Sequence, residues 1–191
     1  MMAAVLVASF LLGSIPNGLI FGKLFWKKDL RRYGSGNVGA TNAWRVLGKK
    51  AGILIFLLDF LKGELSVILA HLAIGTPQAM MLAGLFAIIG HAISPFLKFH
   101  GGKGVATGLG VITILMPSIT ALVLLAWVII VLTTRYVSLA SIAAAVLLPI
   151  LTLILHEERA YVIFGVLAAV VVILRHHDNI LRMRKGRENK I

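Results

Sequence analysis

The sequence predicts an all-α membrane protein with seven transmembrane helices in a single domain over residues 1–191. Three observations support this. The chain is 59% hydrophobic with a mean hydropathy of +0.97, and 14% of its residues are charged, which is too apolar for a soluble domain. Apolar runs of about 20 residues, the length that crosses a bilayer, recur along the chain. Basic residues stand almost entirely between alternate runs.

Five apolar runs are long enough, or nearly so, to be single membrane helices. They cover residues 3–21, 51–73, 79–97, 137–155 and 161–174. Residues 105–134 are long for one helix and short for two, and Pro117 stands near their middle. Proline removes a backbone donor and favours a turn, so we expect two short helices of about 13 to 15 residues each in 105–134.

The distribution of Lys and Arg decides between six and seven helices. Lys62 lies inside an apolar run, which leaves 18 of the 19 Lys and Arg residues outside the runs. A division at Pro117 places 17 of them on one face with only Arg159 opposite, whereas one undivided helix separates them 11 to 7. Basic residues concentrate in cytoplasmic loops, so we expect seven helices, the N-terminus outside and the C-terminus in the cytoplasm. The 17 residues are Lys23, Lys27, Lys28, Arg31, Arg32, Arg45, Lys49, Lys50, Lys98, Lys103, Arg135, Arg175, Arg182, Arg184, Lys185, Arg187 and Lys190.

Three polar segments on this basic face contain the candidate site. They cover residues 34–45 (GSGNVGATNAWR), 91–107 (HAISPFLKFHGGKGVAT) and 175–188 (RHHDNILRMRKGRE). In the first, glycines alternate with small polar residues, a composition that lets successive backbone N–H groups turn toward one point and form a nest for an anion. In the second, glycines allow close approach around Lys103, which supplies a positive charge, and the following helix offers its N-terminal amides. We therefore expect a phosphate-bearing substrate.

Other functions that use similar residues are less consistent with the sequence. GSGNVG follows a membrane helix instead of a buried strand, and GGKG lacks the P-loop spacing, so a nucleotide site is not indicated. Membrane topology accounts for the net charge of +12 without nucleic acid. The chain has no cysteine, and we expect neither a metal nor a cofactor. An anion transporter or channel is the main alternative, although the polar groups crowd one face and no internal repeat is present.

Two further groups of charged residues have structural interpretations. Asp59 and Lys62 are three residues apart inside an apolar run, which favours an ion pair within the membrane that holds helices together. Glu188 is expected to brace the C-terminal tail through Arg182 or Arg45, because a carboxylate beside a phosphate would repel it.

In order and spacing, the polar segments resemble the PlsY family, the bacterial glycerol-3-phosphate acyltransferases that use acyl phosphate as donor. The resemblance covers nearly the whole chain. It rests on GSGNVGATN with Arg45, on GGKGVAT after His91, on RHxxNIxR with GxE, and on the D-x-x-K-G at residues 59–63. One departure is Pro95, which stands four residues after His91 where three are expected, and it concerns only the local helix end.

The resemblance implies a multi-pass enzyme of the bacterial inner membrane, with its active site on the cytoplasmic face. It would transfer a fatty acyl group from acyl phosphate to the 1-hydroxyl of sn-glycerol 3-phosphate, giving lysophosphatidic acid and phosphate, the first acylation of phospholipid biosynthesis. Partners would be these substrates, membrane lipid and, as a further candidate, the enzyme that forms acyl phosphate. Because acyl phosphate is already activated, we expect direct transfer without an acyl-Ser35 intermediate.

The implied site residues fall into two sets. The catalytic set is Ser35, His91, His176 and Asn179, and the substrate-binding set is Gly34, Gly36, Asn37, Thr41, Arg45, Gly101, Gly102, Lys103 and Gly104.

Overall fold

The chain folds almost entirely as helix, and the computed structural model describes all of residues 1–191. There are ten α-helices, two short 3-10 helices and no β-strand, so the all-α prediction is confirmed. The elements are α1 (Met2–Ser14), α2 (Asn17–Trp26), η1 (Leu30–Arg32), α3 (Ala40–Leu47), α4 (Lys49–Ala73), α5 (Pro77–Ala92), η2 (Pro95–Leu97), α6 (Val105–Leu115), α7 (Pro117–Thr134), α8 (Val137–Ile154), α9 (Arg159–Arg175) and α10 (His177–Arg184).

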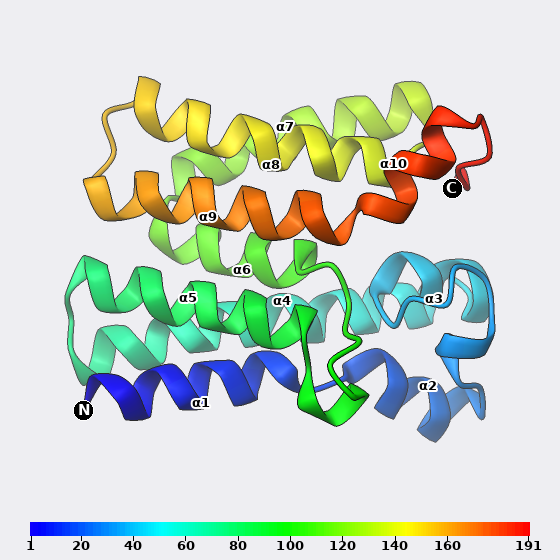
Figure 1. The fold of residues 1–191 in the computed structure, drawn as a ribbon, viewed down its shortest axis with the longest axis horizontal. Helices are drawn as coiled ribbons and strands as arrows, with labels where there is room; N and C mark the ends of the chain where they lie inside the picture. Colours follow the sequence, from blue (N-terminus) through cyan, green and yellow to red (C-terminus); the bar gives the residue numbers. More distant parts are fainter.

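The long helices lie side by side with similar axis directions (Figure 1). Helix α1 packs against α4 and α5, α8 packs against α7 and α9, and α6 packs mainly against α4 and lies between the two groups. The short helices α2, α3 and α10 lie together at one end of the molecule, at the right of Figure 1, and the N-terminus lies at the other end.

Pro117 divides residues 105–134 as predicted. Helix α6 ends at Leu115 and α7 begins at Pro117, where the missing N–H would have had no helical partner. The two helices have 11 and 18 residues, so the expectation of nearly equal halves is wrong. Helix α7 continues until Arg135, whose left-handed backbone (φ 66°) ends it.

The predicted membrane segment over residues 3–21 lies within the apolar segment Met2–Trp26, but it is not one continuous helix, because the chain breaks at Ile15 and Pro16. Helix α1 ends at Ser14, and α2 begins at Asn17 and runs on to Trp26. Proline cannot donate a backbone hydrogen bond and disfavours helical backbone in the residue before it, which accounts for the break. The expected helix over 79–97 likewise ends earlier, at Ala92, and continues only as η2 after Ser94.

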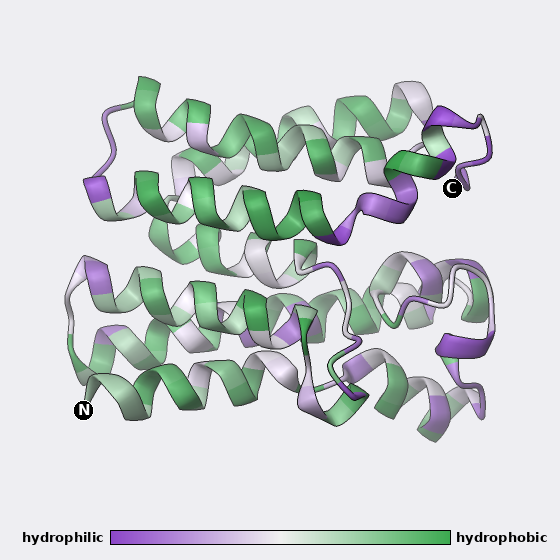
Figure 2. Cartoon of the chain, in the orientation of Figure 1, coloured by the Kyte–Doolittle hydropathy of each residue, from purple (hydrophilic) through white to green (hydrophobic).

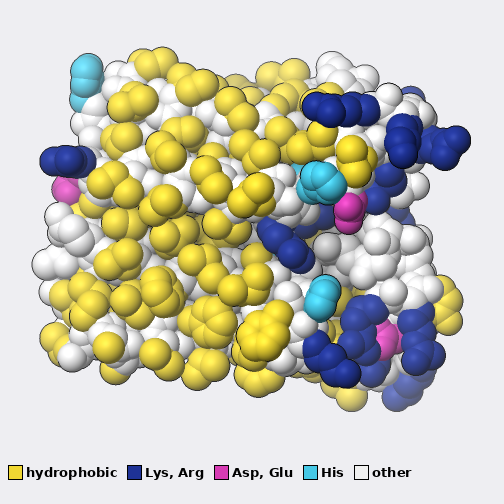
Figure 3. Space-filling model, in the orientation of Figure 1, with side chains coloured by type: hydrophobic (Ala, Val, Ile, Leu, Met, Phe, Trp, Pro, Cys, Tyr) yellow, Lys and Arg dark blue, Asp and Glu magenta, His cyan; other side chains and the backbone are white.

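Length and composition identify four helical segments that suit a membrane. They are Met2–Trp26, Pro77–Leu97, Pro117–Thr134 and Val137–Ile154, with a fifth if α9 and α10, bent by 58°, count as one. Helix α4 is long but carries Asp59, Lys62 and Glu64 in its middle, and α6 has only 11 residues. Large apolar side chains cover the outside of the bundle (Figure 3). The chain is therefore a multi-pass membrane protein.

Polar residues gather at the end of the bundle that holds α2, α3 and α10. Figure 2 shows most of the hydrophilic segments there and in the loop that precedes α6, with a smaller one between α8 and α9 at the other end. Figure 3 shows most of the Lys and Arg side chains on the visible face at the same end and few at the other. The three polar segments predicted to form the site thus lie at one end.

Helices α4 and α6 approach closely because a glycine of each helix lies against the backbone of the other. A Cβ at Gly63 would overlap the Thr107 carbonyl oxygen, and a Cβ at Gly110 would overlap that of Phe60. Small residues at helix contacts are a common device for close packing in membranes. This contact holds α6, and with it the loop of Lys103, against α4.

We expect Gly110→Ala to destabilise the protein by about 1 to 3 kcal/mol, because the added methyl would force α6 away from α4. The measurement is the thermal unfolding midpoint in detergent. Gly108→Ala in the same helix is the matched control, since its Cβ would meet only Ile88 Cδ1 at an ordinary 3.5 Å. Equal midpoints for the two variants would contradict the close contact.

Candidate active site

A cavity of about 880 Å³ lies among α3, α4, α6, α7, α8 and α9 at the polar end of the bundle. Groups from all three polar segments line it. They are Ser35, Asn37, Thr41 and Arg45 from the first, His91, Lys103 and Gly104 from the second, and His176, Asn179 and Glu188 from the third. The structure therefore brings together nine of the thirteen predicted site residues, and Gly34, Gly36, Gly101 and Gly102 do not line the cavity.

The first polar loop is organised by Asn42, which is only 2% exposed. Its Nδ2 donates to the carbonyl oxygens of Leu30 (3.2 Å), Tyr33 (3.0 Å) and Asn37 (2.8 Å), and its Oδ1 accepts from Ser35 N (2.9 Å). One buried amide thus fixes the whole turn.

Backbone N–H groups of this loop are already used within it. Ser35 N donates to Asn42, Gly36 N to the Tyr33 carbonyl, and Gly39 N to Asn37 Oδ1. The predicted nest is therefore not formed by these three groups. Gly34 and Gly36 serve the turn through left-handed backbone (φ 61° and 72°), and side chains supply the polar lining.

The second loop is fastened on both sides and presents Lys103. Gly101 N and Gly102 N donate to the carbonyls of Ala92 and His91. From the other side, Arg175 donates to the carbonyls of Gly101 (Nη2, 2.8 Å) and Gly102 (Nε, 3.1 Å). These bonds leave no free peptide group at either glycine, so their part in the site is to hold the loop.

Lys103 reaches into the cavity and meets the third segment. Its Nζ donates to Asn179 Oδ1 at 2.5 Å. Burial lowers the pKa of the Lys103 ammonium to about 8, the Glu188 carboxylate offsets part of this effect, and the Arg182 and Arg45 cations add to it. A lysine with such a pKa is charged at neutral pH and gains from any anion placed beside it.

The third segment bends at His176, between α9 and α10. His176 is 2% exposed, and its Nδ1 lies 2.7 Å from the Val172 carbonyl oxygen. A carbonyl only accepts, so Nδ1 carries the proton and Nε2 is left as an acceptor. His176 and Asn179, both predicted site residues, line the cavity.

Glu188 ties the C-terminal tail to the site. It accepts from Asn179 Nδ2 (2.6 Å), Arg182 Nε (2.8 Å) and Ser138 Oγ (2.9 Å). Burial alone raises the pKa of Glu188, but the hydrogen bonds from these three side chains outweigh it and the net shift is downward. The predicted brace through Arg182 is confirmed, while Arg45 instead donates to the Asn189 carbonyl (2.9 Å).

Arg45 has unused hydrogen-bonding capacity. Its Nε is buried and has no partner. Burial lowers the pKa of Arg45, Glu188 offsets part of the shift, and Arg182 adds to it. A buried guanidinium N–H without an acceptor is costly, and an oxyanion in the cavity would supply that acceptor.

Apolar side chains make up most of the remaining cavity lining. Val123 and Trp127 of α7, Ala145 and Leu148 of α8, and Phe164 of α9 line it away from the charged groups. On α9 the lining extends from His176 back to Phe164, twelve residues or about 18 Å along a helix. A charged end continuous with an apolar body suits an amphiphile that carries an anionic group and a hydrocarbon chain.

Sequence reasoning did not assign roles to Asn42 and Arg175, although each holds a loop of the site. Both lie within the polar segments, and this position was the only signal of such a role. Their partners lie 5 to 12 residues away for Asn42, and 73 and 74 residues away for Arg175. The spacing of residues in the sequence does not reveal contacts at that distance.

Comparison with known proteins gives a consistent result. A family model described as glycerol-3-phosphate acyltransferase matches residues 3–186. A glycerol-3-phosphate acyltransferase of Syntrophomonas wolfei is 44% identical over 189 residues, which cover 99% of this chain and 96% of that protein. One from Staphylococcus aureus is 42% identical over 199 residues, which cover 100% and 98%.

Two crystal structures share the fold. They show PlsY (YgiH), an integral membrane glycerol 3-phosphate acyltransferase. Its glycerol 3-phosphate form has a TM-score of 0.95 and 40% identity, and its lysophosphatidic acid form has a TM-score of 0.92 and 39% identity. Each match covers 100% of this chain and 95% of the other.

The pKa of Lys103 makes anion binding depend on pH. Above about pH 8 the unoccupied site loses the ammonium proton, so sulfate, which stays a dianion, should bind about tenfold more weakly at about pH 9 than at about pH 7. Isothermal titration calorimetry in detergent measures this. Lys103→Arg, which stays charged over this range, should remove most of the dependence. An affinity in the unmodified protein that does not change with pH would contradict the assignment.

Proposed function

This chain belongs to the glycerol-3-phosphate acyltransferase family, and we propose that acyl phosphate is its donor. The acyl group passes to the 1-hydroxyl of sn-glycerol 3-phosphate and gives lysophosphatidic acid and phosphate. A glycerol-3-phosphate acyltransferase activity follows from the family, and with it a place in phospholipid biosynthesis. The donor, the position of acylation and the residue roles are the proposal.

The observation that carries this function is the unpartnered Nε of Arg45 near the partly buried Lys103. Two cations at the polar end of an otherwise apolar cavity call for an oxyanion, and a guanidinium binds phosphate through two parallel hydrogen bonds. We place the phosphate of glycerol 3-phosphate between Arg45 and Lys103, with Thr41 at the same end. The acyl chain extends into the apolar body toward Phe164.

The reaction requires one bond to form and one to break at the acyl carbon. The 1-hydroxyl oxygen attacks the carbonyl, the bond from that carbon to the phosphate oxygen breaks, and phosphate leaves. We assign Ser35 and Asn37 as donors to the developing oxyanion and the Nε2 of His176 as acceptor of the hydroxyl proton. Asn179 orients Lys103, and the left-handed Gly104 begins α6 beside it.

We further propose that the chain is one acyltransferase domain that crosses the bacterial inner membrane seven times. The crossings are α1 with α2, and then α4, α5, α6, α7, α8 and α9. Helix α6 is only about 17 Å long, but it lies between the two groups of helices, where protein covers it instead of lipid. The excess of Lys and Arg at one end favours an active site on the cytoplasmic face. The enzyme that forms acyl phosphate could deliver the donor to this face.

The donor is tested with the purified protein in detergent micelles. With acyl phosphate and glycerol 3-phosphate together, we expect lysophosphatidic acid and phosphate in equal amounts, and no reaction with acyl-CoA. Acyl phosphate alone should release no phosphate and leave no acyl group on the protein, as mass spectrometry would show. A stoichiometric acyl adduct that disappears in Ser35→Ala would contradict direct transfer but leave the substrates unchanged.

Arg45→Ala should lower kcat/KM for glycerol 3-phosphate by roughly 10- to 150-fold, because a charged hydrogen bond to phosphate contributes about 1.5 to 3 kcal/mol. Steady-state kinetics with saturating acyl phosphate measure it. Lys50→Ala removes an exposed cation outside the cavity and is the control. Similar decreases of kcat/KM in both variants would mean that the basic residues attract the substrate only through their summed electrostatic field.

Seven crossings can be tested by labelling, because the chain has no cysteine of its own. Single cysteines at the exposed positions His100, Arg135 and Arg184 should be protected from an impermeant thiol reagent in intact cells and reactive in inverted vesicles. A cysteine at Glu158 should behave oppositely. Labelling of position 135 from outside would rule out α6 and α7 as separate crossings.

A further inference from the structure

The break between α1 and α2 leaves backbone carbonyls without helical partners among apolar helices. Two side chains from other elements bond to them, and the Ile15 carbonyl also accepts from Asn17 N (3.0 Å). Ser94 Oγ donates to the Ser14 carbonyl (2.6 Å), and Lys62 Nζ donates to the Ile15 carbonyl (3.0 Å). Because water is scarce here, these bonds fix where the break lies relative to α4 and α5.

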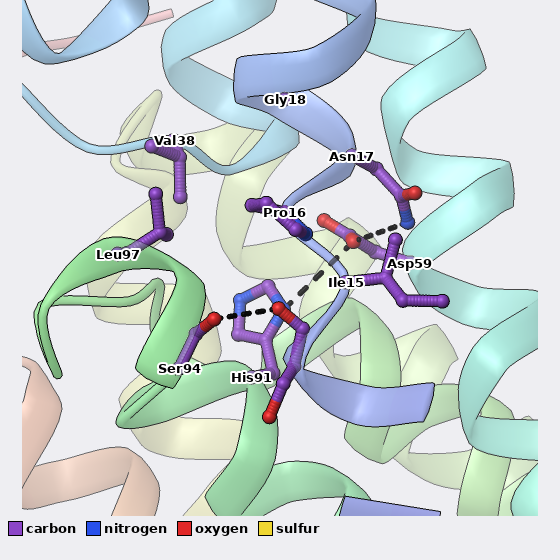
Figure 4. A pocket seen from close by; sticks show the side chains of 10 residues that line it. Ile15, Pro16, Asn17, Gly18, Val38, Asp59, His91, Ser94 and Leu97 are labelled. Atoms are coloured by element: carbon purple, nitrogen blue, oxygen red, sulfur yellow. Dashed lines mark hydrogen bonds and ion pairs between the residues drawn. The ribbon is translucent and has the colours of Figure 1, made fainter. Parts of the chain in front are cut away.

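Asp59 is the centre of this buried group. One of its oxygens, Oδ1, lies 2.8 Å from Lys62 Nζ, accepts from Asn17 Nδ2 at 3.0 Å, and lies 3.8 Å from His91 Nδ1. Figure 4 shows Asn17 and His91 both directed at Asp59. Asp59 and Lys62 are 2% and 4% exposed, so the predicted ion pair within the bundle is present. Asp59 has more polar neighbours than an ion pair that only holds two helices together would need.

The first connection runs from Asn17 to the loop of Asn37. Gly18 follows Asn17 at the start of α2 and packs against the Val38 carbonyl oxygen so closely that no side chain would fit. Val38 is the neighbour of Asn37, which lines the active-site cavity. The bond between Asp59 and Asn17 therefore sets the surface against which the first glycine loop rests.

The second connection runs from His91 to the loop of Lys103. Gly102 packs directly against His91 Nε2, and Gly102 N donates to the His91 carbonyl at 3.0 Å. Lys103 is the next residue after Gly102, so the position of His91 affects the position of Lys103. Asp59 and His91 line the large cavity and also a small one, of about 10 Å³, that Val38 and Leu97 share and that has room for about one water molecule.

We propose that Asp59 is a positioning residue for acyl transfer, which sets the distance between the two glycine loops through Asn17 and His91. This role rests on the proposed function, since those loops present Asn37 and Lys103 to the substrates. Catalytic groups displaced by about 1 Å can lose about 100-fold in rate, so a shift of either loop should be measurable. Asp59 itself needs no contact with the substrates.

Two double variants distinguish a role of Asp59 in positioning the glycine loops from a role only in stabilising helix packing. Asp59→Asn/Lys62→Met and Asp59→Leu/Lys62→Met both remove the ion pair without leaving a buried charge unpaired, so both should unfold at similar temperatures. Only the first keeps an acceptor for Asn17. We expect KM for glycerol 3-phosphate to stay within a few-fold of the unmodified protein in the first and to rise about 10- to 100-fold in the second.

The outcomes decide the proposal. Equal KM values in the two double variants, whether both normal or both raised, would overturn it, because the acceptor for Asn17 would then not matter. If the Leu variant does not fold, Asn17→Ala cuts the same connection with the ion pair intact and should raise KM alike, and a normal KM there would also overturn the proposal. Glu64→Gln, a change from carboxylate to amide elsewhere in α4, is the control. Failure of the proposed function would instead leave the unmodified protein without acyl transfer from acyl phosphate.

Discussion

A polar group buried among the apolar helices of this protein has to find most of its partners within the chain, because hydrocarbon offers none. The break at Ile15 and Pro16 creates such groups, and Lys62 and Ser94 satisfy them. Lys62 then needs a counter-ion, which Asp59 supplies, and Asp59 in turn holds Asn17. A single proline thus leads to a network that joins α1, α2, α4 and α5 next to the site.

The same requirement shapes the loops of the active site. Asn42 and Arg175 donate to carbonyl groups of the two glycine loops, and the N–H groups of Ser35, Gly36, Gly39, Gly101 and Gly102 donate to acceptors within the protein. Arg45 and Lys103 are the side chains that can bind an anion in the cavity. Side chains can be held in a partly dry place where their charge is strong, as the lowered pKa of Lys103 indicates. Backbone amides alone would give a weaker and less adjustable site.

Repulsion among the cations is balanced by one carboxylate. Glu188 bonds to Asn179, Arg182 and Ser138, and Arg45 Nε has no partner within the protein. The C-terminal tail is held by this contact, so the last residues of the chain complete the polar end of the cavity. The glycerol-3-phosphate acyltransferase activity of the family needs an anion and an acyl chain at one place, and here the charged end and the apolar body meet in one cavity.

The sequence by itself determined the helical class, the division at Pro117, the pairing of Asp59 with Lys62 and the gathering of basic residues at one end. Each of these follows from local hydropathy, from proline geometry or from the cost of an unpaired charge in an apolar run. Nine of the thirteen residues that the motif resemblance predicted for the site line one cavity. The break of α1 at Pro16 also follows from proline geometry, although hydropathy alone did not reveal it. The tertiary structure was needed to show that the glycines support turns and close contacts instead of an anion nest, and that Asn42 and Arg175 hold the loops. These features depend on which buried donors and acceptors meet in space, and local sequence patterns do not specify that.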